Sequence, residues 1–377
     1  MFSRSAPARY DTIVAGAGIA GVSAAYWLGR TGRRVLLLDK KGLLAGASGA
    51  AGAFLSPRLG RGGDLQQITN EAYRFALAFY SRTVPEAFFQ KGLVRIPKDR
   101  RDAQRFSGFE PFIDIPHRRV TAAEYPHIAA AAMEEGAFYF PDAAFVDPMT
   151  VARKLTEGVE TAWGVQRPPR YEGGLWRLGR FSAPELVLAT GADPLPVPVT
   201  YLRIGGLWGE RVDLRSEADI PVSLHRNVSV SANIDGTVRV GDTHVRNDTR
   251  SEIERINRLI VDAVDLVPGL SDQRLVRIYA GYRSSVADHF PLAGPLADAA
   301  AAKEALGVPR RGFSPGPEDL PRIRGCYIIG GFGGRGFVFA PWIGKMLADS
   351  IASNEAVDPR VSPDRFLLRY LRRGTKS

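Results

Sequence analysis

Three glycines near the N-terminus have the spacing of a phosphate-binding turn. Gly16, Gly18 and Gly21 form the pattern GxGxxG directly after a short apolar run at residues 13–15. Glycines at this spacing permit a tight turn, close approach of the backbone to a pyrophosphate and close packing of the next helix, whose N-terminus attracts phosphate. Asp39 follows roughly twenty residues later, where a carboxylate can accept both hydroxyls of a ribose and would repel a 2′-phosphate. The pattern therefore predicts a dinucleotide site that disfavours NADP.

Further small-residue stretches narrow this prediction to FAD. Residues 46–52 read GASGAAG and leave room for a second phosphate and a ribitol chain. Residues 186–191 read LVLATG, so Gly191 lies where another strand ends. Residues 330–341 read GGFGGRGFVFAP and open a late helix, whose positive end can hold the negative charge of a reduced flavin. Each stretch alone is an ordinary turn of an α/β protein, but their order along the chain indicates FAD.

An arginine in an otherwise uncharged stretch is the second candidate for chemistry. Residues 279–294 read YAGYRSSVADHFPLAG and follow a strand-like run at 274–279. Glycines and aromatic residues surround Arg283, so it does not belong to a solvated charged face. Its planar guanidinium would bind the carboxylate of a ligand through two hydrogen bonds, or it would pair with a carboxylate of the protein such as Asp288.

These residues require a parallel sheet to position them. Four short apolar runs read as buried parallel strands, at residues 13–15, 35–38, 185–190 and 325–331. Amphipathic patterns predict helices, among them residues 70–89 and 147–163. The fold class is α/β, with a Rossmann-like cofactor domain and an α+β substrate domain built on a mixed sheet.

The α/β pieces recur at both chain ends and in the middle, which predicts a discontinuous cofactor domain interleaved with a substrate domain. The expected FAD-binding domain comprises residues 1–90, 142–200 and 322–377. The expected substrate domain comprises 91–141 and 201–294, and residues 295–321 form an insertion loop.

Composition bounds the remaining possibilities. The single cysteine, Cys326, excludes an internal disulfide and fits a reducing cytosol. No apolar run is long enough to span a membrane, and the five histidines lack metal-binding spacing. Fifty Lys and Arg oppose forty Asp and Glu, and the net charge of +10 attracts polyanions unless the arginines only cover a solvated surface. The densest basic run contains Arg369, Arg372 and Arg373.

Six stretches along the chain resemble one enzyme family: GASG with LSP (46–57), QQITNEAYRFALAFY, VGDTHVRNDT, AGYRSSVADHFPLAG, IGGFGGRGFVFAP and SPDRFLLRYLRRG. On these motifs the chain resembles the D-amino-acid-oxidase-like (DAO) FAD-dependent oxidoreductases, which include glycine oxidase. Within that family it is most similar to the oxidase domains of the MnmC type, found in bifunctional proteins that modify the tRNA wobble uridine. The resemblance covers almost the whole chain and implies an FAD-binding domain of the glutathione-reductase type. The methyltransferase half of that type is missing, and Ala50, Ala51 and Gly52 replace polar residues of the family.

The resemblance implies roles for individual residues. Arg283 matches the arginine that binds a substrate carboxylate in glycine oxidases. Arg335 matches an arginine of the MnmC branch and would meet flavin or substrate, unless it is a surface arginine at a turn. His289 is a weaker catalytic candidate, and Tyr279 and Tyr282 shape the pocket or pack in the core. The predicted FAD-binding residues are Gly16, Gly18, Gly21, Asp39, Lys40, Ala47, Ser48, Gly49, Gly191, Gly333, Gly334, Arg335, Gly336 and Phe337.

The resemblance implies oxidation of the carboxymethylaminomethyl group of tRNA wobble uridine to aminomethyl, with release of glyoxylate. Because this group is an N-substituted glycine, the same arginine would serve a free amino-acid oxidase or dehydrogenase acting on glycine, sarcosine or a D-amino acid. A third alternative is a flavin-fold protein that binds RNA without turnover. tRNA is the expected partner, a separate methyltransferase would act on the product, and a cytoplasmic location is expected. FAD is expected to be non-covalent, because Cys326 is not at the AGYR position where a related sarcosine oxidase carries its cysteinyl link.

Overall fold

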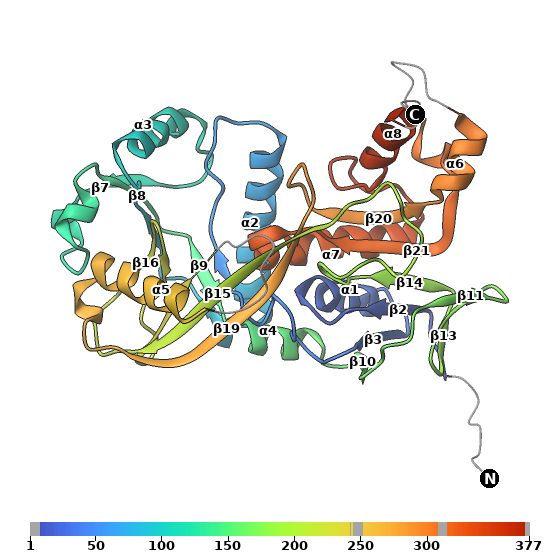
Figure 1. Ribbon diagram of the computed structural model, residues 1–377, viewed down its shortest axis with the longest axis horizontal. Coiled ribbons are helices and arrows are strands. Elements are labelled where there is room, and N and C mark those ends of the chain that lie inside the picture. Colours follow the sequence, from blue (N-terminus) through green and yellow to red (C-terminus); the bar gives the residue numbers. More distant parts are fainter. Residues whose placement is uncertain (1–7, 242, 244–251, 308–314, 374–377) are drawn as a thin grey trace, which may run out of the picture.

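A sheet that is buried on both faces forms the centre of one lobe (Figure 1). In the computed structural model, which describes residues 8–241, 243, 252–307 and 315–373, its strand order is β10-β3-β2-β14-β21-β20. The strand bounds, in that order, are Glu160–Trp163, Val35–Asp39, Thr12–Ala15, Glu185–Leu188, Arg322–Gly330 and Leu292–Ala297. Neighbours are parallel, except that β20 runs antiparallel to β21. The four predicted buried strands are confirmed and lie side by side.

Apolar residues on both faces of these strands explain why the sheet is enclosed. Val14 and Val187 contribute to one hydrophobic core, whereas their neighbours Ile13 and Leu186 contribute to another. Side chains alternate between the faces of a strand, so a continuous apolar run fits only a sheet covered on both sides. The first face is covered by α1 (Ile19–Arg30), α2 (Asp64–Thr83) and α7 (Gly336–Ser353).

A smaller sheet and two helices supply residues to the core on the second face. This sheet has the order β1-β13-β12-β11, with bounds Ala8–Arg9, Phe181–Ala183, Leu175–Leu178 and Arg170–Glu172. The helices are α6 (Ala299–Leu306) and α8 (Asp364–Arg373).

The second lobe is built on an eight-stranded mixed sheet with the order β19-β15-β18-β17-β16-β6-β8-β7. The bounds are Arg274–Ser285, Gly205–Arg215, Thr237–Gly241, Ser229–Val230, Ser223–His225, Leu93–Arg95, Ala137–Phe140 and Arg118–Val120. Its core includes apolar side chains of α5 (Ile253–Leu266), and α3 (Arg100–Phe109) belongs to the same lobe (Figure 1). The strands β4, β9 and β5 (Phe54–Leu55, Ala144–Val146 and Phe88–Phe89) form a three-stranded sheet, and β9 is followed by α4 (Pro148–Leu155).

The long strands β15 and β19 run from the second lobe toward the first (Figure 1). At its end, β19 forms a bridge between Ser285 and Phe332, in the turn that precedes α7. This bridge places the AGYR segment against the glycine-rich turn of the first lobe.

Three secondary-structure predictions were wrong in extent. The helix expected at 70–89 begins at Asp64 and ends at Thr83, because Pro85 cannot continue it. The helix expected at 147–163 ends at Leu155, after which Gly158 has a φ of +78° and the chain enters β10. The AGYR segment does not follow a strand but is part of β19.

Some predictions fall outside the described residues, namely positions 242 and 244–249 of the VGDTHVRNDT motif, positions 308–314 of the insertion and the side chain of Arg373. The domain boundaries stay a prediction, and β20 crosses the one expected between residues 294 and 295. Among the helices in the described part of the chain, none combines the length and the apolar character needed to cross a bilayer.

Candidate active site

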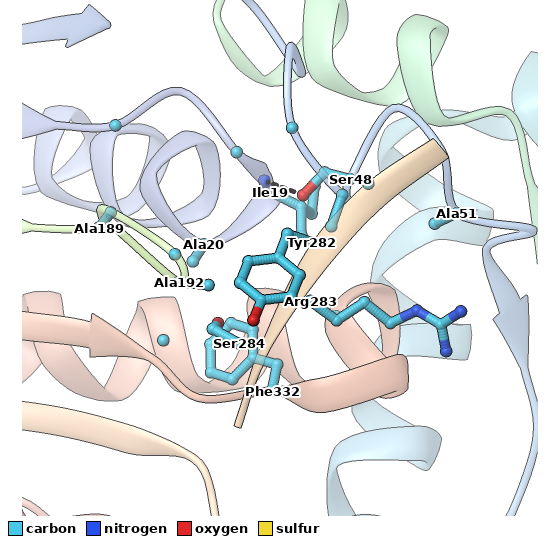
Figure 2. Close-up of a pocket in the computed structure, with 18 of the residues that line it drawn as sticks. Ile19, Ala20, Ser48, Ala51, Ala189, Ala192, Tyr282, Arg283, Ser284 and Phe332 are labelled. Atoms are coloured by element: carbon cyan, nitrogen blue, oxygen red, sulfur yellow. Dashed lines mark hydrogen bonds between the residues drawn. The ribbon is translucent and has the colours of Figure 1, made fainter. Parts of the chain in front are cut away.

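A cavity of about 1130 Å³ lies where the two lobes meet. Its walls come from the start of α1, the loop at 45–54, the turn after β14, strand β19 and the turn before α7 (Figure 2). The volume exceeds the roughly 300–1,000 Å³ of pockets that hold one small ligand. The cavity is therefore large enough for a dinucleotide together with a substrate.

Close packing explains two glycines of the GxGxxG turn. Gly16 has a φ of +114°, and a Cβ at this position would lie 2.3 Å from the carbonyl oxygen of Ala189. A Cβ at Gly21 would lie 1.9 Å from the carbonyl oxygen of Gly16. Gly18 precedes α1 and provides no side-chain cap. The helix thus begins on the cavity wall with N–H groups suited to a phosphate, which fits the dinucleotide prediction.

The loop after β3 lies between this helix and strand β19 and contacts both. The backbone N–H of Ile19 donates a hydrogen bond to Oγ of Ser48 at 3.0 Å (Figure 2). On the other side of the loop, a Cβ at Gly281 of β19 would lie 2.4 Å from Cα of Ala47. Ala47 and Ser48, both predicted to contact FAD, lie on the cavity wall, while Gly49 lies next to Ser48 in the loop.

The carboxylate of Asp39 is held at the end of β3 by backbone groups. One oxygen accepts from the N–H of Ala17 at 2.9 Å, and the other accepts from those of Lys41 at 2.7 Å and Gly42 at 3.0 Å. A carboxylate offers about four acceptor positions. Asp39 therefore has capacity for about one ribose hydroxyl, and accepting both would require releasing a backbone N–H.

The turn after β14 forms the rim of the cavity across from Asp39. Lys40 pairs with Asp193 at 2.6 Å, so its ammonium joins two segments of the rim. Gly191, which also lines the cavity, has a φ of +66°. Lys40 and Gly191 thus lie where the sequence predicted cofactor contacts, and their role there stays a prediction.

Arg283 extends from β19 along the cavity wall, away from α1 (Figure 2). Its Nη2 donates to the carbonyl oxygen of Thr243 at 2.8 Å. A Cβ at Gly209 on β15 would lie 1.6 Å from Nη2, so only glycine leaves space for the guanidinium there. A Cβ at Gly334 would lie 3.7 Å from Nη1, which places the group beside the turn before α7. Arg283 thus lies between the second lobe and that turn.

Asp288 is not the partner of Arg283. Asp288 instead pairs with Arg365 of α8 at 2.8 Å. That ion pair ties the segment after β19 to the C-terminal helix and leaves the carboxylate of Asp288 unavailable to Arg283.

The turn before α7 carries the remaining predicted residues. Gly333, Gly334, Arg335, Gly336 and Phe337 all line the cavity. Nη1 of Arg335 donates to the carbonyl oxygen of Ser56 at 2.9 Å, and its side chain is only partly exposed. Burial, together with repulsion from Arg95 and Arg58, lowers the pKa of Arg335 to about 9. The alternative of a solvated surface arginine is therefore not supported.

Sequence reasoning missed Arg58, Arg95 and His225, which line the same cavity. Burial lowers the pKa of both arginines, and the charge of Arg58 lowers that of Arg95 further. Burial and the charges of Arg95 and Arg335 lower the pKa of His225 to about 3, so its ring is neutral at pH 7. One signal in the sequence was the placement of Arg95 in the apolar run LVRIP, where a buried strand has an unexplained charge.

The remaining candidates separate into two groups. Tyr282 and His289 line the cavity, whereas Tyr279 packs between arginines, with the guanidinium of Arg211 3.9 Å from its ring centre. Cys326 is 1% exposed in the sheet core, and burial raises the pKa of its thiol to about 12. Within residues 8–241, 243, 252–307 and 315–373, no group of His, Cys, Asp and Glu side chains is arranged to hold a metal ion.

Comparison with protein families agrees with this arrangement. Residues 11–350 match the family described as FAD dependent oxidoreductase (DAO). The chain is 28% identical to the tRNA 5-methylaminomethyl-2-thiouridine biosynthesis bifunctional protein MnmC of Pseudomonas paraeruginosa, over all of this chain and 62% of the relative. It is 26% identical to the protein of the same name from Leptospira interrogans, over 96% of this chain and 61% of the relative. The chain thus spans about three fifths of the length of these curated relatives.

Comparison with solved structures shows the same fold. Glycine oxidase from Geobacillus kaustophilus superimposes with a TM-score of 0.75 at 20% identity, covering 93% of this chain and 96% of that one. Iminodiacetate oxidase from Chelativorans superimposes with a TM-score of 0.73 at 20% identity, covering 93% and 98%. The Rossmann-like cofactor fold predicted from the sequence is confirmed.

Proposed function

The chain belongs to the family of FAD dependent oxidoreductases, and from that premise we propose that it oxidises the carboxymethylaminomethyl group of tRNA wobble uridine. The product would be an aminomethyl group, with glyoxylate released. Similarity to MnmC proteins over 96–100% of the chain supports a substrate on tRNA. The observation that carries the proposal is the guanidinium of Arg283 in the cavity wall, because the group to be oxidised ends in a carboxylate.

The geometry around Arg283 suits orientation of such a substrate. The guanidinium rests over the backbone of Gly209 and is tied to the carbonyl oxygen of Thr243, so its position is restricted. A positioned guanidinium binds a carboxylate with fixed orientation, which places the adjacent α carbon. Arg283 would therefore orient the reacting C–H bond, and no acid–base pair of side chains is required.

The proposed reaction balances with FAD as the oxidant. When bound, FAD would accept a hydride from the α carbon while the amine nitrogen loses its proton. The resulting imine takes up one water and separates into the primary amine and glyoxylate. Substrate, oxidised flavin and water thus give aminomethyl uridine, glyoxylate and reduced flavin.

FAD is proposed to be held without a covalent bond. The glycine turn, Ser48 and Asp39 offer groups for phosphate and ribose at one end of the cavity. The thiol of Cys326 lies in the sheet core and does not line the cavity. Acid denaturation should therefore release all yellow colour into the supernatant, and colour that stays with the precipitated chain would contradict this assignment.

One experiment tests the proposed reaction directly. The holoenzyme is incubated with tRNA that carries carboxymethylaminomethyl uridine at the wobble position, and the nucleosides are analysed by mass spectrometry. The expected result is conversion to aminomethyl uridine with an equal amount of glyoxylate. Turnover of glycine, sarcosine or a D-amino acid without conversion of the tRNA would replace the proposal with a free amino-acid oxidase.

A further inference from the structure

Three arginines from separate segments converge on one side of the cavity. Arg58 follows β4, Arg95 is the last residue of β6, and Arg335 ends the turn before α7. Arg335 donates to the carbonyl oxygen of Ser56 and Arg95 contacts that of Pro57, the two residues directly before Arg58, which places the three side chains in one part of the cavity. We call Arg58, Arg95 and Arg335 the arginine cluster.

Among the residues that the structure describes, the arginine cluster lacks the carboxylate partners that neighbouring arginines have. In the same lobe, Arg211 pairs with Asp213 at 3.1 Å and Arg239 with Asp147 at 2.8 Å. Within the described residues, no carboxylate lies within 4 Å of a guanidinium nitrogen of the cluster. Asp102 acts on Arg95 only from a greater distance.

The hydrogen bonds of the cluster also leave donors available. Arg335 donates to the carbonyl oxygen of Ser56 at 2.9 Å, and Arg95 makes a long contact of 3.5 Å with that of Pro57. Each guanidinium has five N–H donors. Within the described part of the chain, several donors of the cluster therefore have no acceptor and lie beside the cavity.

A neutral histidine adds a further unsatisfied group. Nε2 of His225 is buried and, in the described part of the chain, has no hydrogen-bond partner, and the residue lines the same cavity. A buried polar atom without a hydrogen-bond partner destabilises the folded state. A ligand that is anionic and accepts hydrogen bonds would offset both this destabilisation and the repulsion among the clustered positive charges.

We propose that Arg58, Arg95 and Arg335 bind a second anionic group of the substrate, apart from the carboxylate at Arg283. The carboxylate site at Arg283 and the arginine cluster lie on either side of the turn before α7. Gly334 of this turn faces Arg283, whereas the side chain of its neighbour Arg335 reaches Ser56. The inference rests on the proposed function, in which the second anion is a phosphate next to the wobble uridine. In a free imino acid the same chemistry would come from a second carboxylate.

The proposal makes a statement about specificity. A substrate with one carboxylate, such as glycine or sarcosine, would engage Arg283 and leave the arginine cluster without an anion. A substrate with two anionic groups would neutralise both Arg283 and the arginine cluster. The cavity should therefore prefer dianionic substrates, whichever compound supplies them.

The test compares two pairs of substrates that differ by one anion. The first pair is carboxymethylaminomethyl uridine and its 5′- or 3′-monophosphate, and the second is sarcosine and iminodiacetate. For the wild-type holoenzyme, kcat/KM should be at least about tenfold higher for the dianionic member of the pair that is used, because charge-assisted hydrogen bonds are strong. Arg58→Met and Arg335→Met should bring this ratio close to one, whereas Arg105→Met, on the exposed part of α3, should leave it at the wild-type value.

The outcomes separate the two proposals. A ratio lost only within the uridine pair identifies phosphate as the second anion, and a ratio lost only within the free pair identifies a carboxylate. If tRNA that carries carboxymethylaminomethyl uridine is not converted, the proposed function fails, while the free pair still tests the arginine cluster. A wild-type enzyme without preference in either pair, or variants that lower both members equally, would overturn the inference.

Binding can also be measured without turnover. Inorganic phosphate should raise the Tm of the wild-type holoenzyme and of Arg105→Met, and raise that of Arg58→Met much less. Arg58→Met is the safer variant, because Arg335→Met also removes the hydrogen bond to Ser56. Equal phosphate shifts in all three proteins would overturn the inference.

Discussion

The two ends of the cavity are built from different chemical groups. At the end near α1, the polar groups are backbone N–H groups of a glycine turn and the carboxylate of Asp39. At the end near the second lobe, they are the guanidinium groups of Arg58, Arg95, Arg283 and Arg335. The first end is built mainly from the segment between Gly16 and Ser48, with the turn after β14 as its rim, whereas the second is assembled from four distant segments. The comparison indicates that ligand binding at the first end depends on backbone shape, whereas ligand binding at the second end depends on side-chain charge.

The largest expected effect comes from changing backbone shape at the first end. Gly16→Ala would place a Cβ 2.3 Å from the carbonyl oxygen of Ala189 at a φ of +114°. We expect loss of bound flavin and a decrease of at least about 1–3 kcal/mol in the free energy of unfolding. Flavin absorbance per chain and urea denaturation would measure both.

Gly29→Ala is the matched control for that substitution. Gly29 lies inside α1, and a Cβ there meets no atom within 4 Å. Alanine in a helix is favoured over glycine by about 0.5–1 kcal/mol, so this variant should keep its flavin and gain stability. Normal flavin content in Gly16→Ala would show that the turn does not set the shape of the cofactor end.

A smaller effect, confined to turnover, is expected from charge at the second end. Arg283→Ala should keep flavin content and lower kcat/KM about ten- to a hundredfold, because a charge-assisted pair contributes about 1.5–3 kcal/mol. Arg283→Lys should recover only part of the wild-type kcat/KM, since an ammonium cannot form the bidentate hydrogen bonds of a guanidinium. Steady-state kinetics with the wobble substrate would measure the loss.

The control is a substrate analogue that lacks the carboxylate. Its oxidation should be insensitive to Arg283→Ala, and Arg105→Ala should affect neither compound. If both compounds lose turnover equally, Arg283 supports the structure and does not bind the carboxylate.

The pH dependence of stability should reveal the charge concentrated at the second end. Because the pKa of His225 is lowered to about 3, its ring stays neutral in the folded state while the unfolded chain takes up a proton below about pH 6.5. The free energy of unfolding therefore falls as pH drops from 6.5 toward 3, by at most about 1.4 kcal/mol per pH unit from this group. His225→Gln should make the curve flatter in that window, as measured by denaturation at several pH values.

Ser229→Ala serves as the control for this measurement. Ser229 pairs with His225 across β16 and β17 but carries no titratable group. It should reproduce the wild-type slope. An unchanged slope in His225→Gln would mean that the histidine does not feel the burial and positive charge of this end.

The smallest effect concerns charge outside the cavity. Arg369 is exposed on α8, and Arg369→Ser should reduce the slope of log affinity for tRNA against log salt by about 0.7–0.9 if it contacts one phosphate. Arg177→Ser, at an exposed position on β12, is the control and should keep the slope. Equal changes in both variants would indicate that tRNA responds to overall charge and not to α8.

Local sequence was sufficient for the first end of the cavity. The GxGxxG spacing, the strand before it and Asp39 after it lie in one segment, and the structure places them together. The extent of α4 was harder to predict, because its apolar pattern continues into residues that pair with β3 as a strand. Tertiary pairing decided that boundary.

The second end depended on contacts that no local pattern contains. Arg283 was singled out by its uncharged surroundings and by family resemblance. Arg58 and Arg95 lie on separate segments, and only the folded chain shows that they approach Arg335. An arginine in an apolar strand indicates such a site, but this pattern does not identify the residues that lie next to the arginine in the fold.

The pairing of β15 with β19 has a consequence for how this sequence can diverge. Leu207 lies opposite Arg283 and Trp208 opposite Tyr282, within a pairing that extends to Arg215 and Arg274. Adding or deleting one residue in this part of β19 would exchange the faces of its side chains and remove Arg283 from the wall. Gains and losses of residues should instead accumulate at tight surface turns such as Gly173–Gly174 between β11 and β12. Among descendants of this sequence, the length of β19 should therefore persist longer than the identity of its residues.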